Sequence, residues 1–254
     1  MSADPQGDEQ AVANPLPLFY RAPEPLTAHR HGDWRLHDGD LSFAAETPFV
    51  PIVAGEIAAA ARDYPVVFAA GGAQPIAVLG VEYENLFVED GRWIPDAYVP
   101  AYVRRYPFGF IRTVNPDGFA LAIDTGADRV TREGEDGAAL FDADGPTALT
   151  RQAMRFCEAF EGEAAATSAF VGALVAADLL VDRRADVTLP DGRKLGLDGF
   201  GIVDAERFAA LPGETILDWH RKGWLGLIHL HLSSLERFPA LLARRASRNE
   251  ASAS

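Results

Sequence analysis

The stretch Val66-Val-Phe-Ala-Ala-Gly-Gly-Ala-Gln-Pro-Ile-Ala-Val-Leu-Gly-Val81 contains two short apolar runs separated by a glycine pair. Apolar runs of this length between turn residues are typical of buried β-strands. Gly71-Gly72 supplies the reversal between them, because glycine adopts the backbone conformations that tight turns need. The stretch therefore predicts two strands, Val66–Ala70 and Pro75–Val81, within an antiparallel sheet.

Further strand pairs surround this stretch. Asp90-Gly91 and Asp191-Gly192 are Asp-Gly pairs, which strongly favour a tight hairpin turn. The segments expected to pair are 85–88 with 92–94, 108–113 with 119–124 across Asn115–Gly118, and the two halves of 186–197. Leu41–Ala45 and Phe200–Val203 are predicted as further short strands. A short helix is expected over Ala54–Asp63, ending before Pro65.

Helices dominate the second half of the chain. Ala148–Glu161 carries apolar residues at helical spacing, and Ala164–Leu180 is a longer, Ala-rich run. Asp204 is a typical helix N-cap for residues 205–211, and more helix is expected over 214–220 and 222–242.

The predicted fold class is α+β. An antiparallel sheet-rich N-terminal half is expected to pack with a helix-rich C-terminal half that contains one β-hairpin. We expect residues 16–244 to form one domain between disordered polar tails at 1–15 and 245–254.

Composition excludes several classes of protein. The chain has 254 residues, with 37 Asp plus Glu against 23 Lys plus Arg, which gives a formal net charge of −14. Hydrophobic residues make up 48 %, enough for a core, so the chain is not mainly disordered. The lone Cys157 excludes a disulfide scaffold, and the negative field argues against a nucleic-acid partner.

The expected compartment is the cytoplasm. No run reaches the roughly 18 apolar residues of a membrane-spanning helix, and residues 1–15 lack the pattern of a secretory signal. Surface association by a route that needs no signal peptide is left open.

One dense cationic and aromatic cluster is the main candidate site. It consists of Tyr98, Tyr102, Arg104, Arg105 and Tyr106. Arginine forks bind carboxylates or phosphates through two hydrogen bonds, and tyrosines add contact area. The cluster therefore predicts a recognition surface for an anionic group. In the structural alternative, one arginine pairs with a carboxylate while the aromatic rings fill the core.

A second candidate follows the predicted helix at 54–63. Arg62, Asp63 and Tyr64 stand at its C-terminal end, and Glu56 lies about one and a half turns earlier. We predict that this turn contributes to the same ligand site. The alternative is that Arg62 caps the helix, because a cation is favourable at a helix C-terminus.

No metal or cofactor is expected. His29, His31 and His37 match no known ligand spacing. Asp142-Ala-Asp-Gly145 begins like a calcium loop, but Ala153 stands where the last acidic ligand of such a loop belongs.

Three more chemically reactive side chains are expected to be structural or exposed. His229 and His231 would point about 200° apart on a helix, which predicts one buried, hydrogen-bonded histidine and one exposed. Cys157 lies between Phe156 and Phe160 and is predicted to be a buried core residue.

Several segments together resemble one family of bacterial proteins. They are Ala60-Ala-Arg-Asp-Tyr-Pro-Val-Val-Phe68, Glu84-Asn-Leu-Phe-Val88, Tyr98-Val-Pro-Ala-Tyr-Val-Arg-Arg-Tyr-Pro-Phe108, Leu140-Phe-Asp142, Val187-Thr-Leu-Pro-Asp-Gly-Arg-Lys-Leu195 and His220-Arg-Lys-Gly-Trp-Leu-Gly-Leu-Ile-His-Leu-His-Leu232. In order and spacing they are similar to the SapC family, over roughly residues 15–242. The resemblance implies an association with bacterial surface (S-layer) proteins, and it carries over no reaction or catalytic residue.

Three functional hypotheses follow. The first is a non-enzymatic accessory or binding protein that recognises a peptide or protein partner in a surface- or envelope-related process. Its groove would be lined by Tyr98–Phe108 and Arg62–Tyr64. The second is an enzyme, or the partner subunit of one, acting on peptides or amino-acid derivatives, with Asp63 or Glu56 as acid or base. The third is a homodimer that assembles through the apolar C-terminal helices around Trp224 and Leu235.

Overall fold

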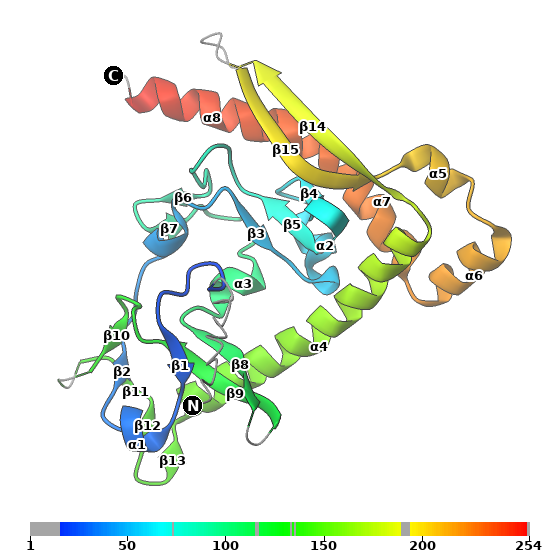
Figure 1. Cartoon of the computed structure of the whole chain (residues 1–254). Helices are drawn as coiled ribbons and strands as arrows, with labels where there is room; N and C mark the ends of the chain where they lie inside the picture. The colour runs from blue at the N-terminus through cyan, green and yellow to red at the C-terminus, as the bar shows by residue number, and fades with distance from the viewer. Residues whose placement is uncertain are drawn as a thin grey trace, which may run out of the picture.

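A five-stranded antiparallel sheet with the strand order β14-β15-β4-β5-β3 lies at the centre of the molecule (Figure 1). The computed structural model describes residues 16–72, 74–114, 117–132, 134, 136–188 and 194–252. The sheet strands are β3 (Phe49–Pro51), β4 (Val66–Ala69), β5 (Pro75–Val78), β14 (Leu180–Thr188) and β15 (Lys194–Val203). The two strands predicted from residues 66–81 are confirmed. Gly71 between them has a φ of +74°, which glycine adopts without strain.

The register of the sheet separates its two faces. Val67 pairs with Ile76, and the next residue along β4, Phe68, pairs with Pro75. Successive side chains in a strand point to opposite faces. The Phe68 ring contacts Phe170 on α4 (Ala148–Ala176) and His231 on α7 (Trp224–Ser234), so these helices cover its face.

The helix α7 is attached to the sheet by two side chains one turn apart. The Val203 N–H of β15 donates to His231 Nε2 at 3.0 Å, so the proton of the neutral ring is on Nδ1, which donates to Val66 O at 2.8 Å. Ser234 Oγ accepts from Val66 N at 2.9 Å. Burial lowers the pKa of His231 to about 4. His229 is exposed, which confirms the prediction that one of the two histidines is buried and hydrogen-bonded and the other is exposed.

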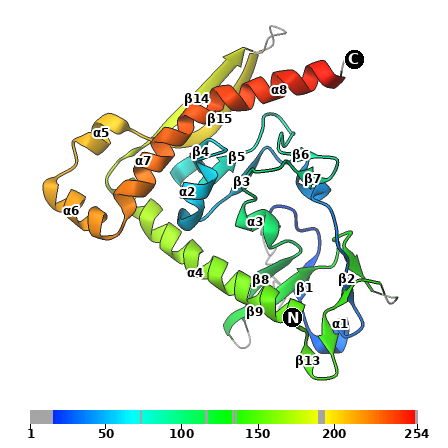
Figure 2. The same cartoon turned by 180° about the vertical axis from the view of Figure 1, so that it is seen from behind.

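A second antiparallel sheet, in the order β1-β9-β8, lies beside the first half of α4 (Figure 2). Its strands are β1 (Pro23–Pro25), β8 (Phe108–Val114) and β9 (Asp117–Asp124). The smaller strands are β2 (Arg35–Leu36) with β10 (Val130–Thr131) and β11 (Ala138–Ala139), β6 (Val88–Glu89) with β7 (Arg92–Trp93), and β12 (Phe141–Asp142) with β13 (Gly145–Pro146).

The predicted hairpins over 85–94, 108–124 and 186–197 are all present as paired strands. The last is longer than expected, because β15 continues through the separately predicted strand at 200–203. The turn residues 115, 116, 191 and 192 lie outside the described part of the chain, as does the predicted tail at 1–15.

The remaining helices are short, apart from α8. They are α1 (Ala28–His31), α2 (Ile57–Ala60), α3 (Ala101–Arg104), α5 (Ala205–Ala209), α6 (Gly213–Arg221) and α8 (Phe238–Ser252), with 3-10 turns η1 (Ser42–Ala44), η2 (Ala54–Glu56), η3 (Ala70–Gly72) and η4 (Leu235–Arg237). Asp204 caps α5 as predicted, because its Oδ1 accepts from the N–H groups of residues 206 and 207.

Two local predictions are wrong. The separate helices expected at 148–161 and 164–180 form one continuous helix, α4, of 29 residues. A single glycine at 162 costs only about 1 kcal/mol in a helix interior, and α4 buries side chains along its length from Thr150 to Leu174. The strand expected at 41–45 is the 3-10 turn η1, because Asp40 Oδ1 accepts from Ser42 N and favours a turn.

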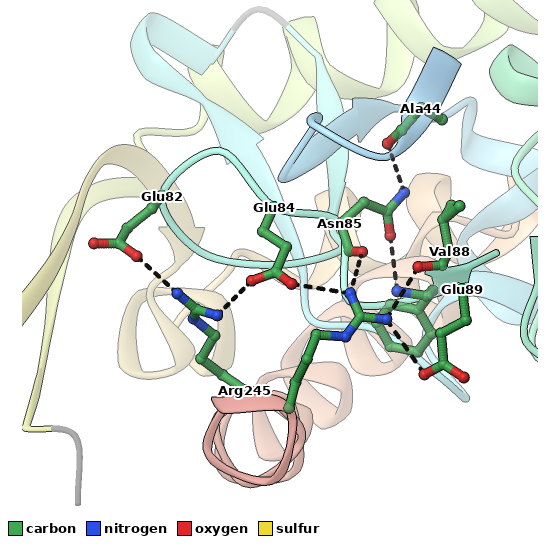
Figure 3. A network of polar contacts seen from close by, with 9 residues as sticks. Ala44, Glu82, Glu84, Asn85, Val88, Glu89 and Arg245 are labelled. Atoms are coloured by element: carbon green, nitrogen blue, oxygen red, sulfur yellow. Dashed lines mark hydrogen bonds and ion pairs between the residues drawn. The ribbon is translucent and has the colours of Figure 1, made fainter. Parts of the chain in front are cut away.

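The disordered tail expected at 245–254 is also corrected, since α8 continues to Ser252. Figure 3 shows the contacts that fix this helix to the loop after β5. Arg245 pairs with Glu84, and Arg248 donates to Glu84 Oε1 at 3.0 Å. The same two arginines also contact Glu82, Asn85, Val88 and Glu89. Interactions with distant residues therefore order a segment whose composition alone favours disorder.

The observed architecture is α+β, as predicted, with antiparallel sheets and helices packed around them. Trp224 and Leu235, suggested as dimer contacts, are half-buried and pack against the chain's own main core. Among the described residues, no helix is both long and apolar enough to cross a membrane.

Candidate functional site

Tyr98 is the point at which the two predicted site segments meet. The backbone N–H of Tyr98 donates to Asp63 Oδ2 at 2.9 Å, and the carbonyl oxygen of Tyr98 accepts from the Tyr64 hydroxyl. The Tyr98 hydroxyl donates to Glu56 Oε1 at 2.7 Å. Burial, followed by this contact with Glu56, raises the pKa of Tyr98 to about 12. The Arg62–Tyr64 turn therefore positions the segment that leads into α3.

Glu56 is a buried structural carboxylate. Only 6 % of it is exposed, and besides Tyr98 it accepts hydrogen bonds from Val53 N at 3.0 Å and Ala101 N at 2.6 Å. Ala101 is the first residue of α3, whose free N–H groups attract a carboxylate. Glu56 thus fixes the start of the helix that carries the predicted arginines.

The C-terminal end of α3 and the first turns of α4 enclose a cavity of about 350 Å³, called here the arginine cavity. On α4 its lining residues are 149, 152, 153 and 156, a spacing that places them on one face of the helix. The full lining is Leu36, Arg104, Arg105, Tyr106, Phe108, Arg129, Leu149, Gln152, Ala153 and Phe156. These lining residues include three arginines and no aspartate, glutamate, histidine or cysteine.

Arg105 is held by aromatic rings. Its Cζ atom lies 4.1 Å from the ring centroid of Tyr102 and 4.4 Å from that of Phe160. It forms no ion pair with a carboxylate in the described part of the chain, and its Nε atom is buried without a hydrogen-bond partner. Stacking of this kind stabilises an arginine by about 0.5–2 kcal/mol and fixes its orientation. The guanidinium group is therefore ordered and its charge is not neutralised by a neighbour.

Arg104 and Arg129 are held by neutral acceptors. Arg104 Nε donates to Val99 O at 3.0 Å, and its Nη2 donates to the Tyr98 hydroxyl at 3.2 Å. Arg129 Nε donates to His37 O at 3.2 Å. Neither guanidinium group forms an ion pair in the described part of the chain, although the Tyr98 hydroxyl links Arg104 to the Glu56 carboxylate.

Tyr106 connects the cavity to a buried carboxylate. Its hydroxyl donates to Asp124 Oδ2 at 2.9 Å. Asp124 is fully buried and also accepts from Ala22 N at 2.6 Å and Arg21 N at 3.1 Å. Burial, and then the contact with Asp124, raises the pKa of Tyr106. Tyr106 is therefore a neutral wall residue with a fixed position.

Arg62, the cation of the predicted Arg62–Tyr64 segment, does not line the arginine cavity. Arg62 and Asp63 line a separate cavity of about 290 Å³, together with Arg237 and Arg244. The predicted groove is thus two cavities, which share the scaffold around Tyr98. Arg129 and the α4 face at Gln152 and Phe156 were not predicted from the sequence, because tertiary packing brings them to α3. The helical spacing of residues 149–156 is the one local signal for them.

The other reactive side chains lie outside this cavity. No group of three or more metal-binding side chains is found among the described residues. His31 is fully buried with Nε2 3.6 Å from Glu24 Oε1, and His37 contacts the Thr131 hydroxyl. Cys157 is buried as predicted, and burial raises its pKa to about 11, so it is a protonated thiol at neutral pH.

The fold and the cavity define an α+β protein with a pocket that is lined by three arginines and no acidic residue, on a chain of net charge −14. The family model described as SapC matches residues 26–241, and the chain belongs to the SapC family. No curated protein and no solved structure matches the chain.

Proposed function

We propose that this protein binds a peptide or protein partner through a carboxylate group held in the arginine cavity. The observation that carries the proposal is the charge of the lining, with three arginines and no acidic residue in a chain of net charge −14. Cations that line a concave site without acidic neighbours in the lining attract and orient an anionic ligand. Arg105 meets it with a guanidinium group that is already ordered by Tyr102.

The walls of the cavity favour the carboxylate end of a peptide. Leu36 and Phe108 are buried beneath it, and Leu149 and Phe156 are half-buried along α4. An apolar side chain next to a carboxylate matches this combination, since the apolar walls bury the side chain while arginine forks bind the carboxylate. A C-terminal residue with an apolar side chain has this chemistry.

The setting of the interaction is proposed from the family. Resemblance to SapC proteins implies an association with bacterial surface proteins, so the partner is expected in a surface- or envelope-related process. The enzymatic alternative assigns the role of acid or base to Glu56 or Asp63, on a substrate whose carboxylate is held by the arginines. Glu56 and Asp63, the two candidates for that role, do not line the arginine cavity.

An affinity capture from the native host tests this proposal. The baits are the wild-type chain, the double variant Arg104→Ala/Arg105→Ala, and a matched control, Arg62→Ala/Arg237→Ala, in the separate cavity. Mass spectrometry identifies the captured proteins, peptides and small molecules, and circular dichroism verifies that each bait is folded.

We expect a partner that is retained by the wild type and the control but lost from the Arg104/Arg105 variant. The same partners on all three baits would contradict the assignment of the site. Loss from both double variants would also contradict it, since the effect would then reflect general surface charge.

A further inference from the structure

A groove of about 520 Å³ lies on the face of the central sheet that points away from α4 and α7. Val67 and Ile76 are paired across β4 and β5 and both line the groove. The alternate residue Phe68 points to the opposite face, where it contacts α4 and α7. The volume falls within the roughly 300–1,000 Å³ that is typical of small-molecule sites.

The groove has no charged lining. Its described lining residues include no Asp, Glu, Lys, Arg or His, and the polar side chains are Gln74 and Tyr102. The Tyr102 hydroxyl already donates to Leu18 O at 3.2 Å. A ligand in this groove therefore meets apolar surface and few hydrogen-bond partners, so its buried part should itself carry few polar groups.

Prolines make the groove a poor site for a peptide strand. The edge strand β3 follows Pro48 directly and ends at Pro51, and both prolines line the groove, as does Pro17. Proline has no backbone N–H to offer to an added strand. The N–H and C=O groups of a bound peptide would then remain unpaired, which is costly away from water.

Tyr102 is a wall residue of this groove that also contacts Arg105, which lines the arginine cavity and not the groove. Its ring lines the groove and also stacks against Arg105, whose Cζ atom lies 4.1 Å from the ring centroid. An uncharged groove with a guanidinium group behind one of its wall residues is complementary to a molecule with an apolar chain and an anionic end.

We propose that the groove binds the hydrocarbon chain of a free fatty acid, with the carboxylate beside Tyr102, the wall residue that contacts Arg105. The placement of the carboxylate rests on the proposed function of the arginine cavity. The placement of the chain does not, since it follows from the apolar lining alone.

Straight-chain alcohols test the chain separately from the charge. Calorimetric titration of the series from hexanol to dodecanol measures affinity without an anionic end. The variants are Ala69→Phe, which fills the groove from β4, and Phe49→Ser, which removes an aromatic ring that is 48 % exposed at the rim. Phe119→Ser is the matched control, because Phe119 is 65 % exposed on β9 and lies outside the groove.

We expect one site per chain and an affinity that rises about fourfold for each added methylene until the groove is full. Ala69→Phe should weaken the binding of the longer alcohols at least about tenfold, and Phe49→Ser should weaken it less, while Phe119→Ser leaves it unchanged. Affinity that does not depend on chain length, or that is equal in a folded Ala69→Phe variant, would overturn the assignment of the groove. If Ala69→Phe does not fold, an unchanged affinity in Phe49→Ser overturns it instead.

Lauric acid titrated beside dodecanol then tests the anionic end. The proposal predicts that the acid binds more tightly than the alcohol to the wild type, and that this preference disappears in Arg105→Met. Length-dependent binding of alcohols with no preference for the acid would overturn the fatty-acid assignment, and the peptide-binding proposal for the arginine cavity would be judged separately by the capture experiment.

Discussion

Acid is expected to weaken the central sheet through His231. In the folded protein this ring is neutral, because its Nε2 accepts from Val203 N and its Nδ1 donates to Val66 O. Protonation would place an N–H on Nε2 against the N–H of Val203, so that two donors face each other. The ring is fully buried, and no carboxylate of the described residues contacts it, so burial lowers its pKa to about 4.

The magnitude follows from the difference between the folded and unfolded states. The ordinary pKa of 6.5 applies to the unfolded chain and a pKa of about 4 to the folded one. Between these values the unfolded state binds more protons, so stability falls as the pH is lowered. The contribution of His231 is complete above the unfolded pKa, and it decreases by about 2 kcal/mol from about pH 7.5 to about pH 5.

Urea denaturation at several pH values, monitored by circular dichroism, measures this loss. The control is His231→Gln, because an amide can accept from Val203 and donate to Val66 but does not titrate in this range. We expect the wild type to lose about 2 kcal/mol more than the variant from about pH 7.5 to about pH 5. Parallel pH profiles for the two proteins would refute the assigned role of the ring.

Three further substitutions, each with its own readout, test the contacts that hold the fold together. Glu56→Ala removes the acceptor of three hydrogen bonds and should lower the free energy of unfolding by about 3 kcal/mol, measured by thermal denaturation. The exposed control Glu163→Ala should change this free energy by less than about 0.5 kcal/mol. Phe68→Ala should lower the free energy of unfolding, measured by urea denaturation, by about 3–5 kcal/mol, whereas Phe119→Ala, at an exposed position, should lower it little. Equal losses of stability in the two variants would contradict the place of Phe68 in the core. Arg245→Ala should speed amide hydrogen exchange along α8 while lowering overall stability by less than about 1 kcal/mol, and unchanged exchange would mean that the ion pairs do not hold the helix.

The strands with strong local signals could be predicted from the sequence. In the hairpin at 88–93, Asp90 and Gly91 both have positive φ values, which is the conformation that an Asp-Gly pair favours in a tight turn. Gly71 has the same role in the turn before β5. These residues determine the turn by their own conformational preferences, so no distant contact is needed to predict it.

Elements that depend on distant contacts could not be predicted in the same way. The helix α4 continues through Gly162 because it packs along both sheets, and α8 reaches Ser252 because Arg245 and Arg248 meet acidic residues of a loop far away in the sequence. The residues around Gly162 and those after Leu242 contain no sign of these distant partners. Local composition therefore favoured a helix break at Gly162 and a disordered tail at 245–254.

In the candidate site, too, local sequence signals predicted some residues, while others are brought there only by the fold. Arg104, Arg105 and Tyr106 were suggested by their local density of charge and aromatic rings, and all three line the arginine cavity. Arg129 comes from the loop before β10, and only the fold brings it there. Arg62 was grouped with the cluster through its neighbours, yet its side chain lines a different cavity.

The most direct test of the arginine cavity is a pair of calorimetric titrations. The ligands are a short peptide that ends in phenylalanine with a free carboxylate and the same peptide with a C-terminal amide. Charge-assisted hydrogen bonds of about 1.5–3 kcal/mol predict that the acid binds about tenfold to a hundredfold more tightly than the amide. This preference should disappear in Arg105→Met and weaken at high salt. Equal affinity of the acid and the amide for the wild-type chain would contradict the account.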